Sequence, residues 1–333
     1  MKTEIVSAQE CAKAVALLRA GEIVALPTET VYGLAADALE PVAVAKIFEA
    51  KERPRFDPLI VHLPDRDWLA RVAQIRDKDR DLIERLTDRF WPGPFTIVLP
   101  KGPIVPEIAT AGLDTVAVRI SAHPVFSEII RAFGGLLAAP SANRFRRISP
   151  TAAQHVLDEL HGRIPLIIDA GSTTYGIEST IVAVHGAKID ILRRGPITAE
   201  ELSEFGKIDI VAPAGKISAP GQLPSHYAPK TALCLIDDAG TFVPGKNQRV
   251  ALLAWNSVGD DKRFVAIRRL STSQDFRNAA SNLFRFLREL DALDLDLDLI
   301  VAERVPEVGL GAAIMDRLRR AAHPPLNAQD TLE

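Results

Sequence analysis

The feature that most constrains this chain is the alternation of short, β-rich apolar runs with segments of helical period over its first 200 residues. Such alternation is typical of α/β architecture and disfavours a sandwich or a helical bundle. Some runs lie close enough in sequence to pair antiparallel, so we expect a twisted sheet that mixes parallel and antiparallel strands, with helices. The runs that predict strands are 22–26, 58–63, 95–99, 115–120, 136–140, 165–170 and 179–184.

Helix signals fit between these runs. Ser7 and Glu10 have the spacing of a capping box ahead of a helix that should end near Gly21. Pro41 should open a second helix that runs through about Glu52.

The length of 333 residues predicts about two domains. The first domain is predicted over 1–204. Residues 205–230 are rich in Pro, Gly and Ala and predict a linker that folds over the site. From 231 to 333 the alternation resumes, with strands near 232–236, 249–255, 264–267 and 297–303 and helices near 273–290 and 311–321. This part predicts a smaller α/β domain of three layers.

Composition excludes several classes of protein. Lys and Arg total 40 and Asp and Glu total 43, so the chain has no basic excess for nucleic-acid binding. With Cys11 and Cys234 alone, neither a disulfide framework nor a cysteine-based zinc site is expected. The first residues lack a signal-peptide core, and no apolar run approaches the ~18 residues of a membrane span. These features predict a soluble, cytoplasmic protein.

The segment 26–38, LPTETVYGLAADA, runs from a strand directly into hydroxyl and carboxyl side chains. Thr28, Glu29 and Thr30 stand at the end of the predicted strand, where open α/β sheets bind ligands. A β-turn whose side chains bond to their own backbone explains the same spacing equally well.

The segment 51–63, KERPRFDPLIVHL, places three cations at the end of a helix and His62 at the end of the next strand. Cations at the C-terminal end of a helix interact favourably with the helix dipole, so a solvated helix end is one explanation for these residues. Because Pro54 and Pro58 stiffen the loop, a polyphosphate clamp is the other.

A second basic segment, 138–151, carries Ser141, Asn143 and Ser149 together with three arginines. The hydroxyl, amide and guanidinium groups of this segment can bind a nucleobase or a phosphate, or they can simply face solvent. Arg119 differs because it closes an apolar strand, where an arginine usually pairs with an acidic side chain or an anionic ligand.

Other segments are informative mainly because they exclude known kinds of catalytic or phosphate-binding motif. GSTTYGIEST (171–180) has Ile177 where a phosphate-binding loop needs lysine. No GxSxG or HExxH motif occurs. Hydroxyl-rich strand ends and basic loops without a nucleophile suit phosphoryl or nucleotidyl transfer, in which positioning and charge stabilisation do the work.

Seven segments together resemble one known family, and they occur in the family's order: PTETVYGLAADA, KERPRFDPLIVHL, WPGPFT, SANRFRRISPT, GIESTIV, LRRGPI and PGQLPSHYAPK. This pattern is similar to the threonylcarbamoyl-AMP synthases, YrdC-like proteins, in the longer form with a C-terminal extension. The resemblance covers residues 1 to about 230 closely and the remainder more loosely.

The resemblance implies a nucleotidyltransferase that makes L-threonylcarbamoyladenylate from L-threonine, bicarbonate or CO₂, and ATP, with Mg²⁺ accompanying the ATP. The product would serve tRNA modification beside the anticodon, with tRNA and downstream transfer proteins as further partners. Lys51 and Arg53 would act in catalysis, and no residue is expected to ligate a resident metal. Threonine would be bound by Thr30, His62, Arg119, Ala139 and Ser179. ATP would be bound by Lys51, Arg53, Asp57, Thr115, Ser141, Asn143, Ser149, Arg193 and Tyr227, the last also serving as a lid.

Two positions depart from the family pattern. Asp57 stands where the family has Asn, and its charge would repel phosphates unless it meets magnesium or points away. Phe145 and Arg146 replace Ser-Gly, and the lost glycine predicts a different loop conformation.

Two alternatives belong to other classes. A non-catalytic RNA-binding module would use the cluster of Arg144, Arg146 and Arg147. A carbamoyl-transfer enzyme of hydrogenase maturation would share the domain but needs cysteine-rich zinc segments, which two cysteines cannot supply.

Overall fold

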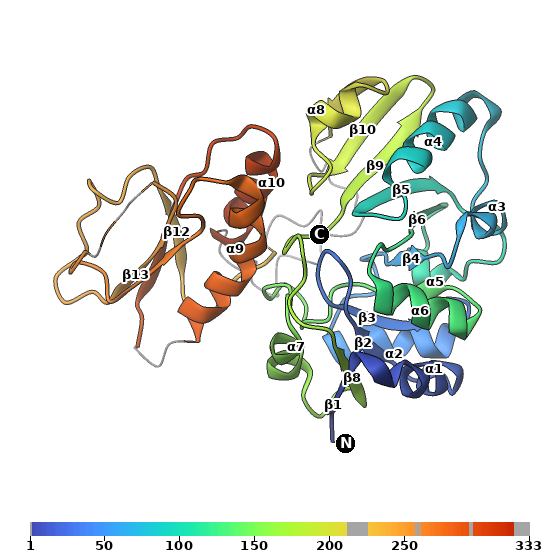
Figure 1. Cartoon of the computed structure of the whole chain (residues 1–333), viewed down its shortest axis with the longest axis horizontal. Coiled ribbons are helices and arrows are strands. Elements are labelled where there is room, and N and C mark those ends of the chain that lie inside the picture. Colours follow the sequence, from blue (N-terminus) through green and yellow to red (C-terminus); the bar gives the residue numbers. More distant parts are fainter. Residues whose placement is uncertain (1, 212–225, 257–258, 260, 293–295, 323–333) are drawn as a thin grey trace. The chain divides into compact units, whose positions relative to one another are not determined.

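The structure, a computed structural model, describes residues 2–211, 226–256, 259, 261–292 and 296–322. The chain forms two compact units (Figure 1). The larger unit comprises Met1–Phe145 and Ser149–Gln222, and the smaller comprises Arg146–Ile148 and Leu223–Glu333. Residues 146–148 thus belong to the smaller unit, although the chain on both sides of them belongs to the larger one.

The larger unit is built on a single sheet of 11 strands among the described residues, in the order β1-β8-β2-β3-β7-β4-β6-β5-β9-β10-β11. Pairs such as β4 with β6 are parallel and pairs such as β5 with β6 are antiparallel, which confirms the predicted mixed sheet. The strands are β1 (Glu4–Ser7), β2 (Val24–Leu26), β3 (Gly33–Asp37), β4 (Ile60–His62), β5 (Phe95–Pro100), β6 (Thr115–Arg119), β7 (Leu137–Ala138), β8 (Leu166–Asp169), β9 (Thr180–His185), β10 (Lys188–Arg193) and β11 (Lys207–Ile210).

Helices cover both faces of this sheet (Figure 1). Along β2, Val24 and Leu26 pack in a cluster with α1 and α6, whereas Ala25 packs in a second cluster with α2 and α7. Burial on both faces explains why these strands are continuous apolar runs rather than alternating ones. The helices are α1 (Cys11–Arg19), α2 (Pro41–Lys51), α3 (Leu69–Val72), α4 (Asp77–Phe90), α5 (Glu107–Thr110), α6 (Pro124–Phe133), α7 (Ala153–Leu160) and α8 (Ala199–Ser203).

Helix ends differ in part from expectation. The predicted capping box at Ser7 is wrong: the Ser7 hydroxyl donates to the Gln9 side chain, and a short 3₁₀ turn over Ala8–Glu10 precedes α1. A reciprocal capping box forms instead at α8, between Thr198 and Glu201. Pro41 opens α2 as predicted.

The first part of the predicted linker, residues 205–230, contains a β-strand. Residues Lys207–Ile210 form β11, which pairs in parallel with β10 and so extends the large sheet. Residues 212–225 of that segment lie outside the described residues. The boundaries predicted at 204 and 230 stay predictions.

The smaller unit has a parallel sheet in the order β12-β15-β13-β14, formed by β12 (Leu233–Ile236), β13 (Val250–Ala254), β14 (Ala266–Arg269) and β15 (Leu299–Glu303). The helices α9 (Phe276–Asp291) and α10 (Leu310–Ala322) pack together beside it (Figure 1). On one face, Val250, Leu252 and Val301 form a core that Phe264 and other loop residues close. This confirms the second α/β domain. Within the described chain, no helix is both long enough and apolar enough to span a membrane.

Candidate active site

A hydrogen-bonded cluster joins Thr28 and Thr30, in the loop between β2 and β3, to Arg119 at the end of β6. The Thr28 hydroxyl donates to the Val31 carbonyl at 2.6 Å and lies 2.8 Å from the Thr30 hydroxyl. Because a hydroxyl has one hydrogen, Thr30 is the donor to Thr28 and accepts a bond from Arg119 Nη1 at 3.0 Å. The loop therefore bonds to its own backbone, as the β-turn explanation predicts, and also to Arg119, whereas ligand binding by its hydroxyls stays a prediction.

Arg119 is held on three sides. Its Nε donates to the Gly93 carbonyl at 3.1 Å, and its Nη2 lies 2.6 Å from Glu29 Oε1. Together with the Thr30 bond, these contacts use three of the five guanidinium N–H groups. Within the described residues, the other two N–H groups have no protein partner and remain available to a ligand.

Glu29 is the acidic partner that an arginine on an apolar strand predicts. Its Oε2 accepts a bond from the Ser121 hydroxyl at 2.5 Å. Burial by itself would raise the pKa of Glu29, but Arg119 and Ser121 outweigh it and hold the pKa below the ordinary value. The site thus contains a fixed, ionised pair beneath its hydroxyl groups.

His62 lies next to Arg119, because β4 and β6 pair with these two residues in register. The His62 side chain is only 2% exposed, and its ring centroid lies 4.7 Å from that of Phe126. Burial, reinforced by the charge of Arg119, lowers the pKa of His62 to about 3. His62 is therefore a neutral imidazole that offers a ligand a hydrogen bond without a charge.

Ser179, which directly precedes β9, extends this line of residues across the sheet. Its hydroxyl lies 2.8 Å from that of Thr96 on β5 and accepts a bond from Arg193 Nη2 at 3.0 Å. Thr96 in turn pairs in register with Arg119. The neighbouring strands β4, β6, β5 and β9 therefore bring His62, Arg119 and Ser179 into one contiguous group with Thr30, which makes four of the five predicted threonine-binding residues. The fifth, Ala139, follows β7 and bonds through its backbone N–H to the Ile60 carbonyl on β4.

Lys51, the last residue of α2, is buried and bonds to two backbone carbonyls. Its ammonium donates to the carbonyl oxygens of Ser141 and Asn143. Burial, together with the nearby charge of Arg53, lowers the pKa of Lys51 well below the ordinary value. Two of the predicted ATP-binding residues are thus connected through Lys51, which positions the loop that carries them.

Arg53 and Asp57 form a buried ion pair, with Nη2 and Oδ2 2.9 Å apart. Arg53 also donates to the carbonyls of Asp57 and Pro58, which closes the loop between α2 and β4. Burial raises the pKa of Asp57, while Arg53, Lys51 and Arg193 act against that rise. The sequence left Asp57 either on magnesium or pointing away; the structure shows a third arrangement, in which Asp57 contacts a cation of the clamp itself.

In the loop from Ser141 to Ser149, Arg146 adopts the left-handed backbone conformation that is usual for glycine. Arg146 has φ +66°, a left-handed conformation that glycine adopts freely and that costs other residues about 1–2 kcal/mol. The different conformation predicted from the lost glycine is thus not required. Ser149 closes the loop by donating from its hydroxyl to Glu178.

The structure does not join two of the predicted ATP-binding residues, Thr115 and Tyr227, to this group by any contact described here. Thr115 begins β6 while Arg119 ends it, so they are about 13 Å apart along the strand. Tyr227 belongs to the smaller unit, where it is 1% exposed and its ring centroid lies 5.2 Å from that of Phe284. The predicted roles of Thr115 and Tyr227 stay predictions.

The sequence analysis did not assign roles to Glu29, Thr96, Ser121 and Glu178, although each bonds to a predicted site residue or to its partner. A signal existed for three of them, since Glu29, Thr96 and Glu178 lie inside the motifs PTETVYG, WPGPFT and GIEST. In the described part of the chain, no group of three or more His, Cys, Asp and Glu residues is placed to hold a metal ion.

Comparisons with known proteins agree with this geometry. A family model described as "Telomere recombination" matches residues 16–195, and one described as "Threonylcarbamoyl-AMP synthase, C-terminal domain" matches residues 197–323. The threonylcarbamoyl-AMP synthase of Pyrococcus abyssi is 38% identical over 326 residues, which cover 93% of each chain. That of Bacillus subtilis is 38% identical over 330 residues, covering 94% of this chain and 93% of the relative.

A solved structure supports the same relationship. The crystal structure of P. abyssi Sua5 complexed with L-threonine superposes with a TM-score of 0.85 at 35% identity, over 96% of this chain and 98% of that one. Both family models and these full-length relatives therefore show that the chain belongs to the threonylcarbamoyl-AMP synthase family.

Proposed function

We propose that this chain joins L-threonine, bicarbonate or CO₂, and ATP into L-threonylcarbamoyladenylate and releases pyrophosphate. The observation that carries the proposal is the group around Arg119, which joins a buried cation with two free N–H donors to the hydroxyls of Thr30 and Ser179 and to neutral His62. An amino acid with a carboxylate and a hydroxyl side chain matches these donors and acceptors. The P. abyssi relative was solved with L-threonine.

The proposed chemistry needs positioning rather than a protein nucleophile. The threonine amine adds to CO₂ to form a carbamate, and a carbamate oxygen then attacks the α-phosphorus of ATP as the bond to pyrophosphate breaks. Arg119 holds the threonine carboxylate through its two available N–H groups. Three cations lie close enough to Asp57 to interact with its charge: Lys51, Arg53 and Arg193. They make this region cationic, which favours binding of the anionic phosphates.

We propose that Mg²⁺ arrives as the Mg-ATP complex. Magnesium in such sites is bound largely by phosphate oxygens and water, with one or two carboxylates. The carboxylates nearest the cations are Asp57 and Glu178, which contact Arg53 and Ser149 in the structure. These groups fit an ion that the substrate carries rather than a resident metal centre.

Pyrophosphate release tests the proposal directly. We expect release from Mg-ATP and bicarbonate that requires L-threonine, with L-serine as the specificity control. Release independent of threonine, or none from folded protein, would contradict the assigned reaction.

The RNA-binding alternative receives less support. Arg144, part of the basic cluster it relies on, forms an ion pair with Glu159 at 3.3 Å, so its charge is partly neutralised. A role for tRNA as recipient of the threonylcarbamoyl group, through a later transfer reaction, stays part of the proposal. RNA binding that depends on salt, without threonine-dependent turnover, would restore the alternative.

A further inference from the structure

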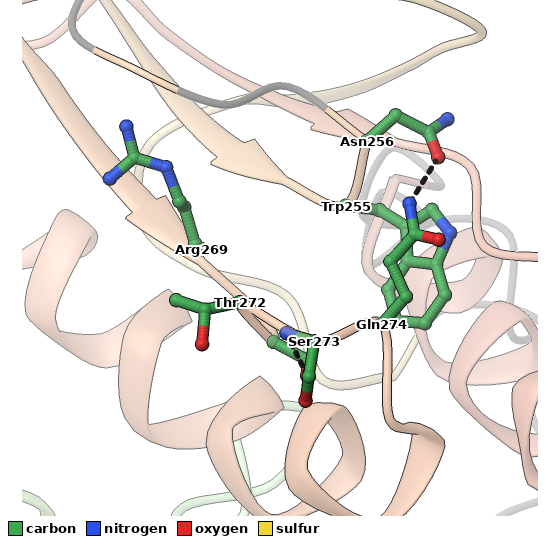
Figure 2. Close-up of a pocket in the computed structure, with 7 residues that line it drawn as sticks. Trp255, Asn256, Arg269, Thr272, Ser273 and Gln274 are labelled. Carbon is green, nitrogen blue, oxygen red and sulfur yellow. Dashed lines mark hydrogen bonds between the residues drawn. The ribbon is translucent and has the colours of Figure 1, made fainter.

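A cavity of about 480 Å³ lies within the smaller unit, and none of the site residues assigned above lines it. Trp255 and Asn256 line it from the loop after β13, and Arg269 with Ser271–Gln274 line it from the end of β14 (Figure 2). The two strands are parallel and end level, because Ala254 pairs with Arg269. The cavity therefore occupies the carboxyl end of a parallel sheet, where open α/β sheets bind ligands, and its size suits a small metabolite.

The wall formed by the loop after β13 is fixed before any ligand arrives. Glu303, fully buried at the end of β15, accepts bonds from the backbone N–H groups of Trp255 and Asn256, both at 2.7 Å. The Trp255 ring stacks on Phe276, with centroids 5.2 Å apart and planes within 6°. A preformed wall lowers the entropic cost of binding.

The loop after β14 is also ordered by its own bonds. The Ser271 hydroxyl accepts from the backbone N–H groups of Ser273 and Asp275. The Gln274 amide donates to Asn256 Oδ1 at 3.4 Å, which links the two loops (Figure 2). Thr272 and Ser273 remain exposed at the pocket.

The charge of the pocket comes from Arg269, the one charged residue among those that line it. Its neighbour Arg268 is neutralised by Glu289 at 2.6 Å, whereas Arg269 bonds only to the Gly259 carbonyl within the described chain. The N-terminus of α9 contributes little to this charge, because Asp275 already caps it. A guanidinium that forms no ion pair with a described residue, beside two exposed hydroxyls, favours an anion with several acceptor oxygens.

We propose that this pocket binds a small phosphate monoester, with Arg269 and the hydroxyls of Thr272 and Ser273 on the phosphate. A phosphate monoester presents three terminal oxygens and a charge of up to −2, so it can engage the Arg269 guanidinium and both hydroxyls more fully than a carboxylate of charge −1. The volume leaves room for the organic part of the ligand beside Trp255 and Gln274. The site is separate from the synthase chemistry and does not depend on it.

The test observes the pocket directly, in the full-length protein. With ¹⁵N-labelled tryptophan, the Trp255 indole resonance is assigned through Trp255→Phe and followed during titration with glycerol 3-phosphate. We expect a saturable shift of this resonance, and Arg269→Ala should weaken binding about 10-fold or more, with partial recovery in Arg269→Lys. Lys246→Ala is the matched control: it removes the same charge from the loop before β13, at the opposite end of that strand, and should bind like the wild type.

The comparison ligands make the result decisive. Glycerol should produce no shift, and acetate should bind much more weakly than the phosphate ester. The absence of a shift, equal binding by Arg269→Ala, or equal binding of acetate would each overturn the phosphate assignment. Threonine-dependent pyrophosphate release should be unchanged in Arg269→Ala, so this outcome is independent of the proposed synthase activity.

Discussion

At the scale of single residues, the site depends on a buried pair that also supports the fold. Arg119 and Glu29 are both less than a tenth exposed and lie 2.6 Å apart. Removing one partner of such a pair leaves the other charge buried without compensation, at a cost of about 3–5 kcal/mol. Activity and stability therefore have to be separated by design.

We expect Arg119→Ala to abolish threonine-dependent pyrophosphate release and to lower the free energy of unfolding by about 3–5 kcal/mol. The double variant Arg119→Ala/Glu29→Gln should recover part of the stability, because no unpaired carboxylate is left, but none of the activity. Urea unfolding and turnover at saturating ATP measure the two effects. Activity in either variant would rule out Arg119 as the carboxylate-binding group.

His62 predicts a pH dependence of stability. Its pKa is about 3 in the folded protein and near 6.5 when the chain is unfolded, so only the unfolded state gains a proton in that range. The stability associated with neutral His62 is thus complete above pH 6.5 and is lost progressively as the pH falls toward 3. We expect His62→Gln to flatten this loss. Parallel unfolding curves for both proteins at pH 7.5 and pH 5.5 would show the expected difference, and equal slopes would contradict it.

At the scale of elements, the turn between α2 and β4 carries the charges that we propose face the phosphates. The ion pair of Arg53 with Asp57 lies at its centre, and Lys51 extends from the helix end to the loop that contains Ser141. The family's usual Asn at position 57 would leave Arg53 with its full charge.

We predict that Asp57→Asn lowers the KM for ATP a few-fold, because the charge opposing the phosphates is removed, and that it destabilises the fold by about 1–3 kcal/mol. Glu52→Gln is the matched control: it makes the same change at an exposed carboxylate close by, which pairs with Arg163. Steady-state kinetics at varied ATP concentration measure the KM of both variants. A raised KM would instead make Asp57 a ligand of Mg-ATP.

How far the sequence predicts the structure can be seen in particular elements. The apolar runs 95–99 and 115–120 become β5 and β6 almost residue for residue, because strands buried on both faces leave an unmistakable pattern. The motifs at strand ends indicated residues such as His62 and Arg119, which the structure places side by side, while their binding of threonine stays a prediction. The sequence did not indicate the acidic partners of Arg119 and Arg53, because a charge pair made across a sheet or a turn has no fixed spacing in sequence. Ser7 does not cap α1 because a 3₁₀ turn over Ala8–Glu10 separates it from the first residue of that helix, Cys11.

At the scale of the whole molecule, the loop proposed to bind the nucleotide, residues 141–149, belongs partly to the second unit. Arg147 forms a parallel bridge with Ala228, Arg146 accepts a backbone bond from Ala228 at 3.0 Å, and Arg288 donates to the Ile148 carbonyl. The smaller unit thereby holds three residues of the loop that carries Ser141, Asn143 and Ser149.

We expect a chain ending at residue 211 to show a KM for ATP raised about 10-fold, because residues 146–148 lose their partners while β11 is kept. A chain ending at 204 should also be less stable, since the edge strand is lost. Arg288→Ala in the full chain tests the same contact without truncation and should raise the KM in the same direction. An unchanged KM in both the 211 truncation and Arg288→Ala would show that the loop holds its conformation alone.

The place of residues 146–148 also determines when the site can be completed during synthesis. Arg288 follows Ile148 by 140 residues, so the ribosome makes it roughly 7–28 s later. Through that interval the large sheet can already form, but residues 146–148 lack the backbone partner Ala228 and the helix α9 that hold them. A nascent chain would thus acquire its fold first and its finished nucleotide loop only when the last domain emerges, which makes the activity of each molecule contingent on complete translation.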